Sequence, residues 1–189
     1  MKMKKEKNKS VLITGASLTN GRIKTPMFRV SYPAVFKPVD FQGNGDLKYA
    51  VTMLFDKKCD LSIMRDAVEA LIVEKFKDVK RKKLRLPFRD GNEEKEDIDG
   101  YKDVIFIRAS SKTKPVIVDC TEERNQIEDE TEFYPGCYAR ATIIPFAYNQ
   151  KGNKGVSFGL HNIQFLKDGE PFTNRGNPDE DYDDNVKGE

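Results

Sequence analysis

One predicted strand carries an aromatic ring and a guanidinium group on the same face. The stretch GCYARATIIPFAY (136–148) alternates in polarity, which places Tyr138 and Arg140 on one side of an extended chain. The opposite side would carry Cys137, Ala139, Ala141 and Ile143, a small apolar set that suits the interior of a narrow barrel. A ring beside a guanidinium can stack a nucleobase and hold a phosphate. The face with Tyr138 is therefore a candidate nucleic-acid contact.

Aromatic and basic residues also alternate in SYPAVFK (31–37) and LPFRDG (86–91). The run KRKKLRL (80–86) adds clustered cations, which can attract phosphates without reading sequence. The candidate phosphate-binding residues are Lys48, Arg89, Arg140, Lys151 and Lys154, and the candidate stacking residues are Tyr32, Phe36, Tyr101, Tyr138, Phe146 and Tyr148. Spacing alone fits equally well a protein whose aromatics are ordinary core and whose lysines are solvated.

Other chemistries have less support in the sequence. The three cysteines are far apart and His161 is the single histidine, so neither a disulfide framework nor a Cys/His metal site is indicated, and we predict no cofactor. The acidic clusters at 93–99 and 119–132 could serve a metal-dependent nuclease or resolvase. They lie on polar loops without an accompanying strand-borne carboxylate pair, which favours a protein that is not an enzyme. A structural β-domain of a virion is the other alternative.

Charge is strongly segregated along the chain. The net charge is +2, but residues 178–189 hold six acids and one lysine, so the remainder carries +7. Residues 1–9 hold five lysines and one glutamate. We predict a basic flexible arm at 1–19, a binding domain at 20–176 and an acidic flexible tail at 177–189. No apolar run approaches the roughly 20 residues of a spanning helix, and the start is unlike a secretory signal, so a cytoplasmic protein is expected.

The elements that must position these residues are mostly short strands. Strands are predicted at 21–32, 46–57, 103–110, 115–120, 137–148 and 154–166, and the last two are joined by a hairpin turn at NQKGN (149–153). We expect Pro26 at an edge or bulge, a bulge at Pro145, and irregular structure through the prolines and glycines of 32–46. A helical period predicts one main helix over 60–79, capped by Asp60 or Ser62, followed by a long charged connection at 80–102. Together these indicate a mainly β fold, a β-barrel of the OB type with one main α-helix inserted between strands.

The order of several segments resembles a family of phage single-stranded-DNA-binding proteins that was long catalogued as a domain of unknown function. The matching segments are VSYPAVFKP, KYAVTMLFDK, LPFRDGNEE, FIRASSKTKP and the block from EFYPGCYAR to KDGEPF, which together cover about residues 20–184. The resemblance implies an OB fold and sequence-independent coating of single-stranded DNA during phage or prophage replication and recombination, in the bacterial host cell. It also implies that the acidic tail recruits replication or recombination proteins, although here Tyr182 is internal and the chain ends VKGE. Whether the protein is a monomer or a dimer stays open.

Overall fold

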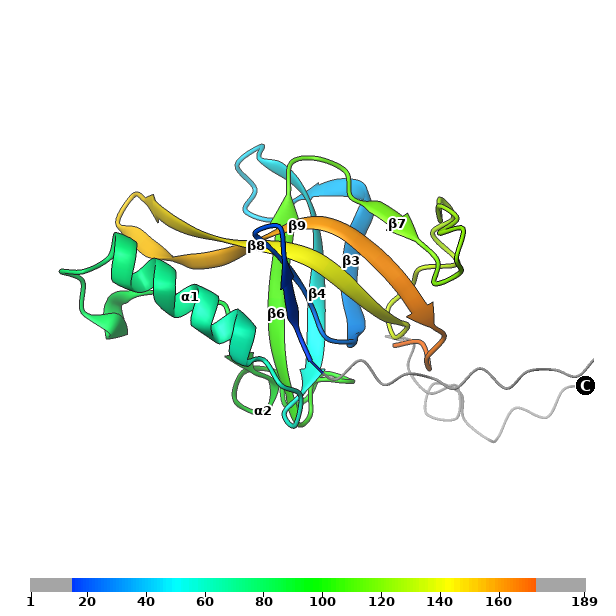
Figure 1. The fold of residues 1–189 in the computed structure, drawn as a ribbon, viewed down its shortest axis with the longest axis horizontal. Helices are drawn as coiled ribbons and strands as arrows, with labels where there is room; N and C mark the ends of the chain where they lie inside the picture. Colours follow the sequence, from blue (N-terminus) through cyan, green and yellow to red (C-terminus); the bar gives the residue numbers. More distant parts are fainter. Residues whose placement is uncertain (1–14, 173–189) are drawn as a thin grey trace, which may run out of the picture.

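The computed structural model describes residues 15–172, which form one large sheet and one main helix (Figure 1). The strands are β1 (Ser17–Thr19), β2 (Arg22–Lys24), β3 (Phe28–Asp40), β4 (Leu47–Asp56), β5 (Arg89–Asp90), β6 (Val104–Ser111), β7 (Val116–Val118), β8 (Tyr138–Gln150) and β9 (Asn153–Lys167). The helices are α1 (Ser62–Lys75), the 3₁₀ turn η1 (Arg81–Lys83) and the short α2 (Gly91–Glu94). The predicted arm and tail lie largely outside the described residues, although β1 already begins at Ser17.

Five strands of the sheet pair in a closed ring. β3 pairs with β4, β4 with β6, β6 with β9, β9 with β8, and β8 again with β3. The β6–β9 pairing is parallel and the others are antiparallel. The hairpin of β1 and β2 extends the sheet from β8, and β7 extends it from β9. In this ring, β4 and β6 are the two strands that β8 does not pair with.

The ring encloses the hydrophobic core, and α1 packs against the same core. The inward set of β8 includes Ala139, Ala141 and Ile143, all buried, as the alternation predicted. The helix contributes Met64, Val68 and Ile72 and lies along the outer part of the β8–β9 hairpin (Figure 1). The expected cap by Asp60 or Ser62 is wrong, because Leu61 is the N-cap residue and has no side-chain cap. The Asp60 carboxylate does accept a hydrogen bond from the backbone N–H of Ser62 (2.9 Å), the first residue of the helix.

The irregular structure expected around Pro33 and Pro38 is not observed. β3 continues through Pro33 and Pro38, where the sequence indicated irregular structure. The ladder between β3 and β4 shifts register between Ser31 and Ala34 and again before Val39, so each proline lies in an interrupted stretch where its missing N–H costs no ladder bond.

The bulge expected at Pro145 lies elsewhere. Pro145 pairs in register with Phe158, and the shift in β8 comes earlier, between Thr142 and Ile143. After Ile143, β8 pairs with β9 alone, and a strand with an unpaired edge tolerates proline.

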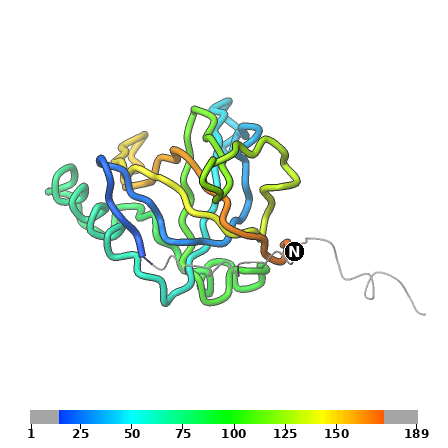
Figure 2. The backbone as a smooth tube through the Cα atoms, turned by 45° about the vertical axis from the view of Figure 1, so that its right-hand side comes forward, coloured from blue at the N-terminus to red at the C-terminus, as the bar shows by residue number. Residues whose placement is uncertain are grey.

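The loops at one end of the ring lie side by side, as the backbone trace shows (Figure 2). The β3–β4 loop and the β6–β7 loop are joined by an ion pair in which Lys112 Nζ lies 3.1 Å from Asp46 Oδ1. Asp40 accepts backbone hydrogen bonds from Gln42 (3.1 Å) and Gly45 (2.6 Å), and these hydrogen bonds lower the pKa of its carboxyl group. The loop is therefore held in a defined shape beside the open face of β4 and β6.

Candidate nucleic-acid interface

The outer face of β4 and β6 changes from covered to open along the strands. Opposite residues in an antiparallel ladder share a face, so the pairs Leu54–Phe106 and Thr52–Arg108 both point outward. Leu54 and Phe106 are buried under Tyr101, whose ring centroid lies 5.1 Å from that of Phe106. The next pair, Thr52 and Arg108, is not covered in this way and forms the floor of a groove.

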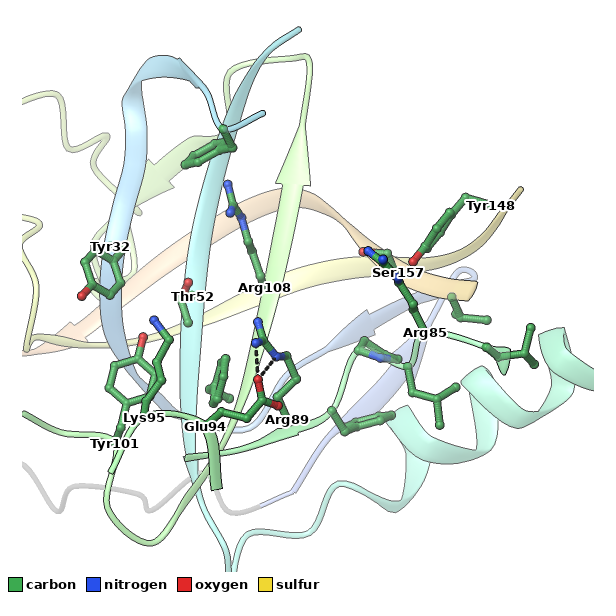
Figure 3. Close-up of a pocket in the computed structure, with 17 residues that line it drawn as sticks. Tyr32, Thr52, Arg85, Arg89, Glu94, Lys95, Tyr101, Arg108, Tyr148 and Ser157 are labelled. Atoms are coloured by element: carbon green, nitrogen blue, oxygen red, sulfur yellow. Dashed lines mark hydrogen bonds and ion pairs between the residues drawn. The ribbon is translucent and has the colours of Figure 1, made fainter. Parts of the chain in front are cut away.

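The groove has a volume of about 930 Å³ and is built from segments far apart in the sequence. It is lined by Tyr32, Phe41, Thr52, Leu84, Arg85, Leu86, Pro87, Phe88, Arg89, Glu94, Lys95, Tyr101, Phe106, Arg108, Tyr148, Val156 and Ser157. Figure 3 shows Tyr32, Lys95 and Tyr101 grouped at one end and Arg85, Tyr148 and Ser157 at the other. We call this surface the groove.

Arg108 lies in the middle of the groove with its guanidinium over the ring of Phe41. The distance from the guanidinium carbon to the ring centroid is 3.4 Å, close enough for a cation–π contact. Burial lowers the pKa of Arg108, yet a guanidinium stays protonated at neutral pH. Phe41 of the β3–β4 loop and Arg108 of β6 thus present a ring and a positive charge together.

The segment 84–88 forms one wall and is fixed to β9. The backbone N–H of Arg85 donates to the carbonyl of Lys154 (2.9 Å), and the N–H of Val156 donates to the carbonyl of Arg85 (3.1 Å). The approach is possible because Gly155 has no side chain: a Cβ there would lie 2.2 Å from the Arg85 oxygen. Phe88 packs edge-on against Phe158 of the core, with ring centroids 6.1 Å apart.

Two further cations, Arg89 and Lys95, lie toward the end of the groove that holds Tyr32 and Tyr101 (Figure 3). The guanidinium carbon of Arg89 lies 4.8 Å from the ring centroid of Phe106, and its side chain forms an ion pair with Glu94. Lys95 Nζ lies 5.1 Å from the ring centroid of Tyr32 and 5.0 Å from that of Tyr101. The long charged connection predicted at 80–102 is therefore ordered and supplies most of this part of the groove.

Four of the predicted residues line the groove: Tyr32, Arg89, Tyr101 and Tyr148. Tyr32 is 51% exposed and has a positive φ of 42°, because it lies at the β3 bulge, which turns its ring away from the core. Tyr101 is almost fully buried. Its hydroxyl lies 3.0 Å from Ser31 Oγ, and burial raises its pKa. Tyr101 therefore supports the groove floor and offers little surface for stacking.

The other predicted residues lie outside the groove: Phe36, Lys48, Tyr138, Arg140, Phe146, Lys151 and Lys154. Phe36 packs against the core, with its ring centroid 6.5 Å from that of Phe133. Lys48 Nζ forms an ion pair with Asp46 at 2.7 Å. Lys151 lies in the turn of the β8–β9 hairpin, and Lys154 is the second residue of β9, beside the end of the groove that holds Tyr148.

Tyr138 and Arg140 do point outward, as the alternation predicted, but on a strand that pairs with neither β4 nor β6. Lys167 Nζ lies 4.7 Å from the Tyr138 ring centroid, and the guanidinium carbon of Arg29 lies at 5.9 Å. Arg140 Nε donates to Gln164 Oε1 at 2.7 Å. Both side chains have protein partners there, so we do not include them in the groove.

Sequence reasoning missed Phe41, Thr52, Arg85, Lys95 and Arg108 as individual groove residues. Arg108 did leave a signal, because it is the one charged residue within the apolar stretch VIFIRAS. Its alternation with Phe106 predicts a shared face. The pairing of Arg108 with Thr52 depends on a strand register that the sequence does not display.

The described part of the chain offers neither a metal cluster nor a membrane span. Among residues 15–172, no three His, Cys, Asp or Glu side chains lie together in a way that could hold a metal ion. In the same residues, no helix is long and apolar enough to cross a membrane.

In chain order the strands of the ring are β3, β4, β6, β8 and β9, and the groove lies over the second and third, β4 and β6. The loops after the first and fourth strands, β3 and β8, flank it. OB folds bind oligonucleotides and oligosaccharides with this arrangement. Residues 21–189 match the family described as "Enterobacter phage Enc34, ssDNA-binding protein", and the chain belongs to this family. The resemblance stated from the sequence is confirmed.

Individual relatives agree with this assignment. The single-stranded DNA-binding protein of bacteriophage Enc34, solved in complex with ssDNA, superposes with a TM-score of 0.72 at 26% identity over 88% of this chain and all of the other. A putative protein p50 of Acyrthosiphon pisum secondary endosymbiont phage 1 is 31% identical over 82% of this chain and 88% of its own. Gp2.5 of bacteriophage T7 shares the fold, with a TM-score of 0.53 at 15% identity over 88% of this chain and 94% of the other. The predicted mainly β, OB-type fold is confirmed.

Proposed function

We propose that this protein binds single-stranded DNA without sequence preference through the groove, and that it serves phage or prophage DNA replication and recombination inside the bacterial host cell. The observation that carries the proposal is the composition of the groove. Arg85, Arg89, Lys95 and Arg108 supply positive charge, and exposed aromatic rings lie between them. A relative of the same fold and family was solved with ssDNA, which supports the same ligand here.

The groove chemistry favours a single strand because each of its two components matches one part of such a ligand. Clustered cations bind backbone phosphates of any sequence through counterion release. Tyr32, Phe41 and Tyr148 are the aromatic residues that we assign to stacking, which requires bases that are not paired in a duplex. Lys151 and Lys154 at the hairpin turn would extend the phosphate track beyond the groove. We further propose that the charged ends of the chain extend the binding domain, although Ser17–Thr19 of the arm predicted at 1–19 already pair with β2 as β1. We also propose that the acidic tail at 177–189 contacts replication or recombination proteins.

The deciding experiment incubates the protein with a labelled, unstructured single-stranded oligonucleotide, with and without Mg²⁺. We expect a mobility shift with an intact oligonucleotide in both conditions, because we propose a binding protein that is not an enzyme. Cleavage in the presence of Mg²⁺ would instead support the nuclease alternative. The absence of both shift and cleavage would support a structural role.

A duplex of equal length is the matched control for the ligand. The groove should prefer the single strand, since paired bases offer no free faces for Tyr32, Phe41 or Tyr148. Equal or tighter binding to the duplex would contradict the proposal.

A further inference from the structure

Glu94 is the one acidic residue that lines the groove in the part of the chain the structure describes. It lies among four cations, Arg85, Arg89, Lys95 and Arg108. A negative charge in a surface that receives a polyanion opposes binding. Its position therefore needs a physical reason.

Glu94 occupies the hydrogen-bonding edge of Arg89. Arg89 Nε donates to Glu94 Oε2 at 2.7 Å, and Arg89 Nη2 donates to the same oxygen (Figure 3). Two neighbouring N–H groups of a guanidinium are the donors that grip a phosphate or a carboxylate. The Glu94 carboxylate therefore occupies the place that a phosphate oxygen would take at this edge of Arg89.

The backbone around Glu94 is held firmly. Glu94 ends α2, whose first N–H groups are capped by Asp90, which accepts from the Asn92 backbone at 2.9 Å. The Asn92 side chain makes two hydrogen bonds to Asp103, of 3.0 and 2.7 Å. Gly91 lies against the carbonyl of Tyr101, where a Cβ would approach within 1.9 Å. The hydrogen bonds of Asp90 and Asn92 thus fix the short helix α2, which positions the Glu94 carboxylate beside Arg89.

We propose that Glu94 is an internal substitute for phosphate: it holds Arg89 in the DNA-free groove and releases it when a DNA backbone enters. The inference rests on the proposed function. The side chains of Arg89 and Glu94 are 52% and 35% exposed, and ion pairs so exposed are weak enough to be displaced. A strand that also contacts the other groove cations can displace the carboxylate, whereas a mononucleotide makes few contacts to compensate. Glu94 therefore makes the groove selective for polymeric over monomeric phosphates.

The test compares two variants that change the net charge equally. Glu94→Gln removes the carboxylate from the groove. Glu69→Gln removes one from the Arg81–Glu69 pair, a similar arginine–glutamate pair outside the groove, with side chains 57% and 44% exposed. In anisotropy titrations with a labelled oligothymidylate at low salt, Glu94→Gln should bind about two- to fivefold more tightly than the wild type. Glu69→Gln should change affinity less, and the gain from Glu94→Gln should shrink as NaCl rises.

A double-mutant cycle separates release of Arg89 from a general loss of repulsion. In an Arg89→Ala background, the gain from Glu94→Gln should be smaller, because no arginine remains to be released. An equal gain in both backgrounds, or an equal gain from Glu69→Gln, would overturn the inference. Weaker binding by Glu94→Gln would also overturn it and would show that Glu94 orients Arg89 for DNA.

Two controls complete the design. Glu94→Ala must also tighten binding, and melting temperatures check that each variant folds. Failure of the wild type itself to bind the oligonucleotide would reject the proposed function. Binding by the wild type without a gain specific to Glu94 would reject only the role of Glu94.

Discussion

Tyr148 and Tyr138 lie on the same strand, β8, but only Tyr148 lines the groove. Tyr148→Ala should weaken single-strand binding by about 1–3 kcal/mol, the usual contribution of a ring that stacks on a base. Tyr138→Ala should leave affinity nearly unchanged. It should instead lower the melting temperature, since the Tyr138 ring packs against Gly169 and between the cations Arg29 and Lys167.

Anisotropy titrations and thermal melts of both variants check this prediction. If Tyr138→Ala weakened binding more than Tyr148→Ala, DNA would have to follow the outer face of β8, the path that the sequence alternation first indicated.

A second pair of residues tests the cations in the same way. Arg108→Ala should weaken binding and reduce the salt slope by about 0.7, the value for one phosphate of single-stranded DNA that the protein no longer neutralises. Arg140→Ala removes the same charge from the opposite part of the ring, where Arg140 is bonded to Gln164, and should leave the slope unchanged. Titrations at several NaCl concentrations measure both slopes. Equal changes in the two variants would indicate only a general effect of net charge.

For single residues, the sequence predicted the kinds of side chain that line the groove, aromatic and basic, better than their positions. The alternation correctly separated the buried Ala139 and Ala141 from the outward Tyr138 and Arg140. It could not show that a ring has several outer faces and that the walls of the groove stand over β4 and β6. That information depends on strand pairing between distant segments, such as Thr52 with Arg108.

Among the elements, the wall at 84–88 depends on its attachment to β9 at a single glycine. Gly155→Ala would place a Cβ 2.2 Å from the Arg85 carbonyl, a backbone atom that can move away only if the wall shifts. Gly159 lies on the same strand, and a Cβ there would lie 3.5 Å from the nearest atom, an ordinary van der Waals distance. Gly155→Ala should therefore lower both the melting temperature and the affinity for DNA, while Gly159→Ala should be tolerated.

Thermal melts and oligonucleotide titrations of the two glycine variants make the comparison. Unchanged DNA affinity in a folded Gly155→Ala variant would mean that the wall can shift without disturbing the binding surface, and that Arg85 is not positioned by β9.

The elements with a clear period were predicted correctly. The strand at 46–57 is β4, the helix within 60–79 is α1, and the hairpin turn at 149–153 joins β8 to β9. The prediction of irregular structure for 32–46 was wrong as far as Asp40, where β3 ends. Prolines in a sequence count against a strand, and the bulges that accommodate them form only when the strand pairs with a partner. The short elements within 80–102 have no period of their own and are held by contacts such as the bonds between Asn92 and Asp103.

For the whole molecule, salt dependence tests how many phosphates are neutralised. If Arg85, Arg89, Lys95 and Arg108 each contact one phosphate, a plot of log affinity against log salt should have a slope of about −3, from roughly 0.7 per phosphate. Anisotropy titrations from low to moderate NaCl measure it. A flat response would contradict binding through a basic groove.

The acidic tail gives a further prediction, although it lies outside the described residues. Residues 178–189 carry a formal charge of −5 and are tethered to a body of +7, so they can compete with DNA for the groove at an effective concentration that reaches the millimolar range. The last described residue, Phe172, packs on the same cluster as Tyr101 at the groove end. A chain ending at Asn177 should bind single strands more tightly, most at low salt. Equal affinities of the two chains at low salt would contradict tail competition.

The closed ring also determines when during synthesis the protein can first bind nucleic acid. β9 is the last strand of residues 15–172 to leave the ribosome, and it closes the ring by pairing with β6 and β8 and holds Arg85 through Gly155. A nascent chain that lacks β9 has Arg89 and Arg108 but no ring to bring them together with the opposite wall. The growing polypeptide therefore cannot form the groove before β9 has emerged and paired with β6 and β8.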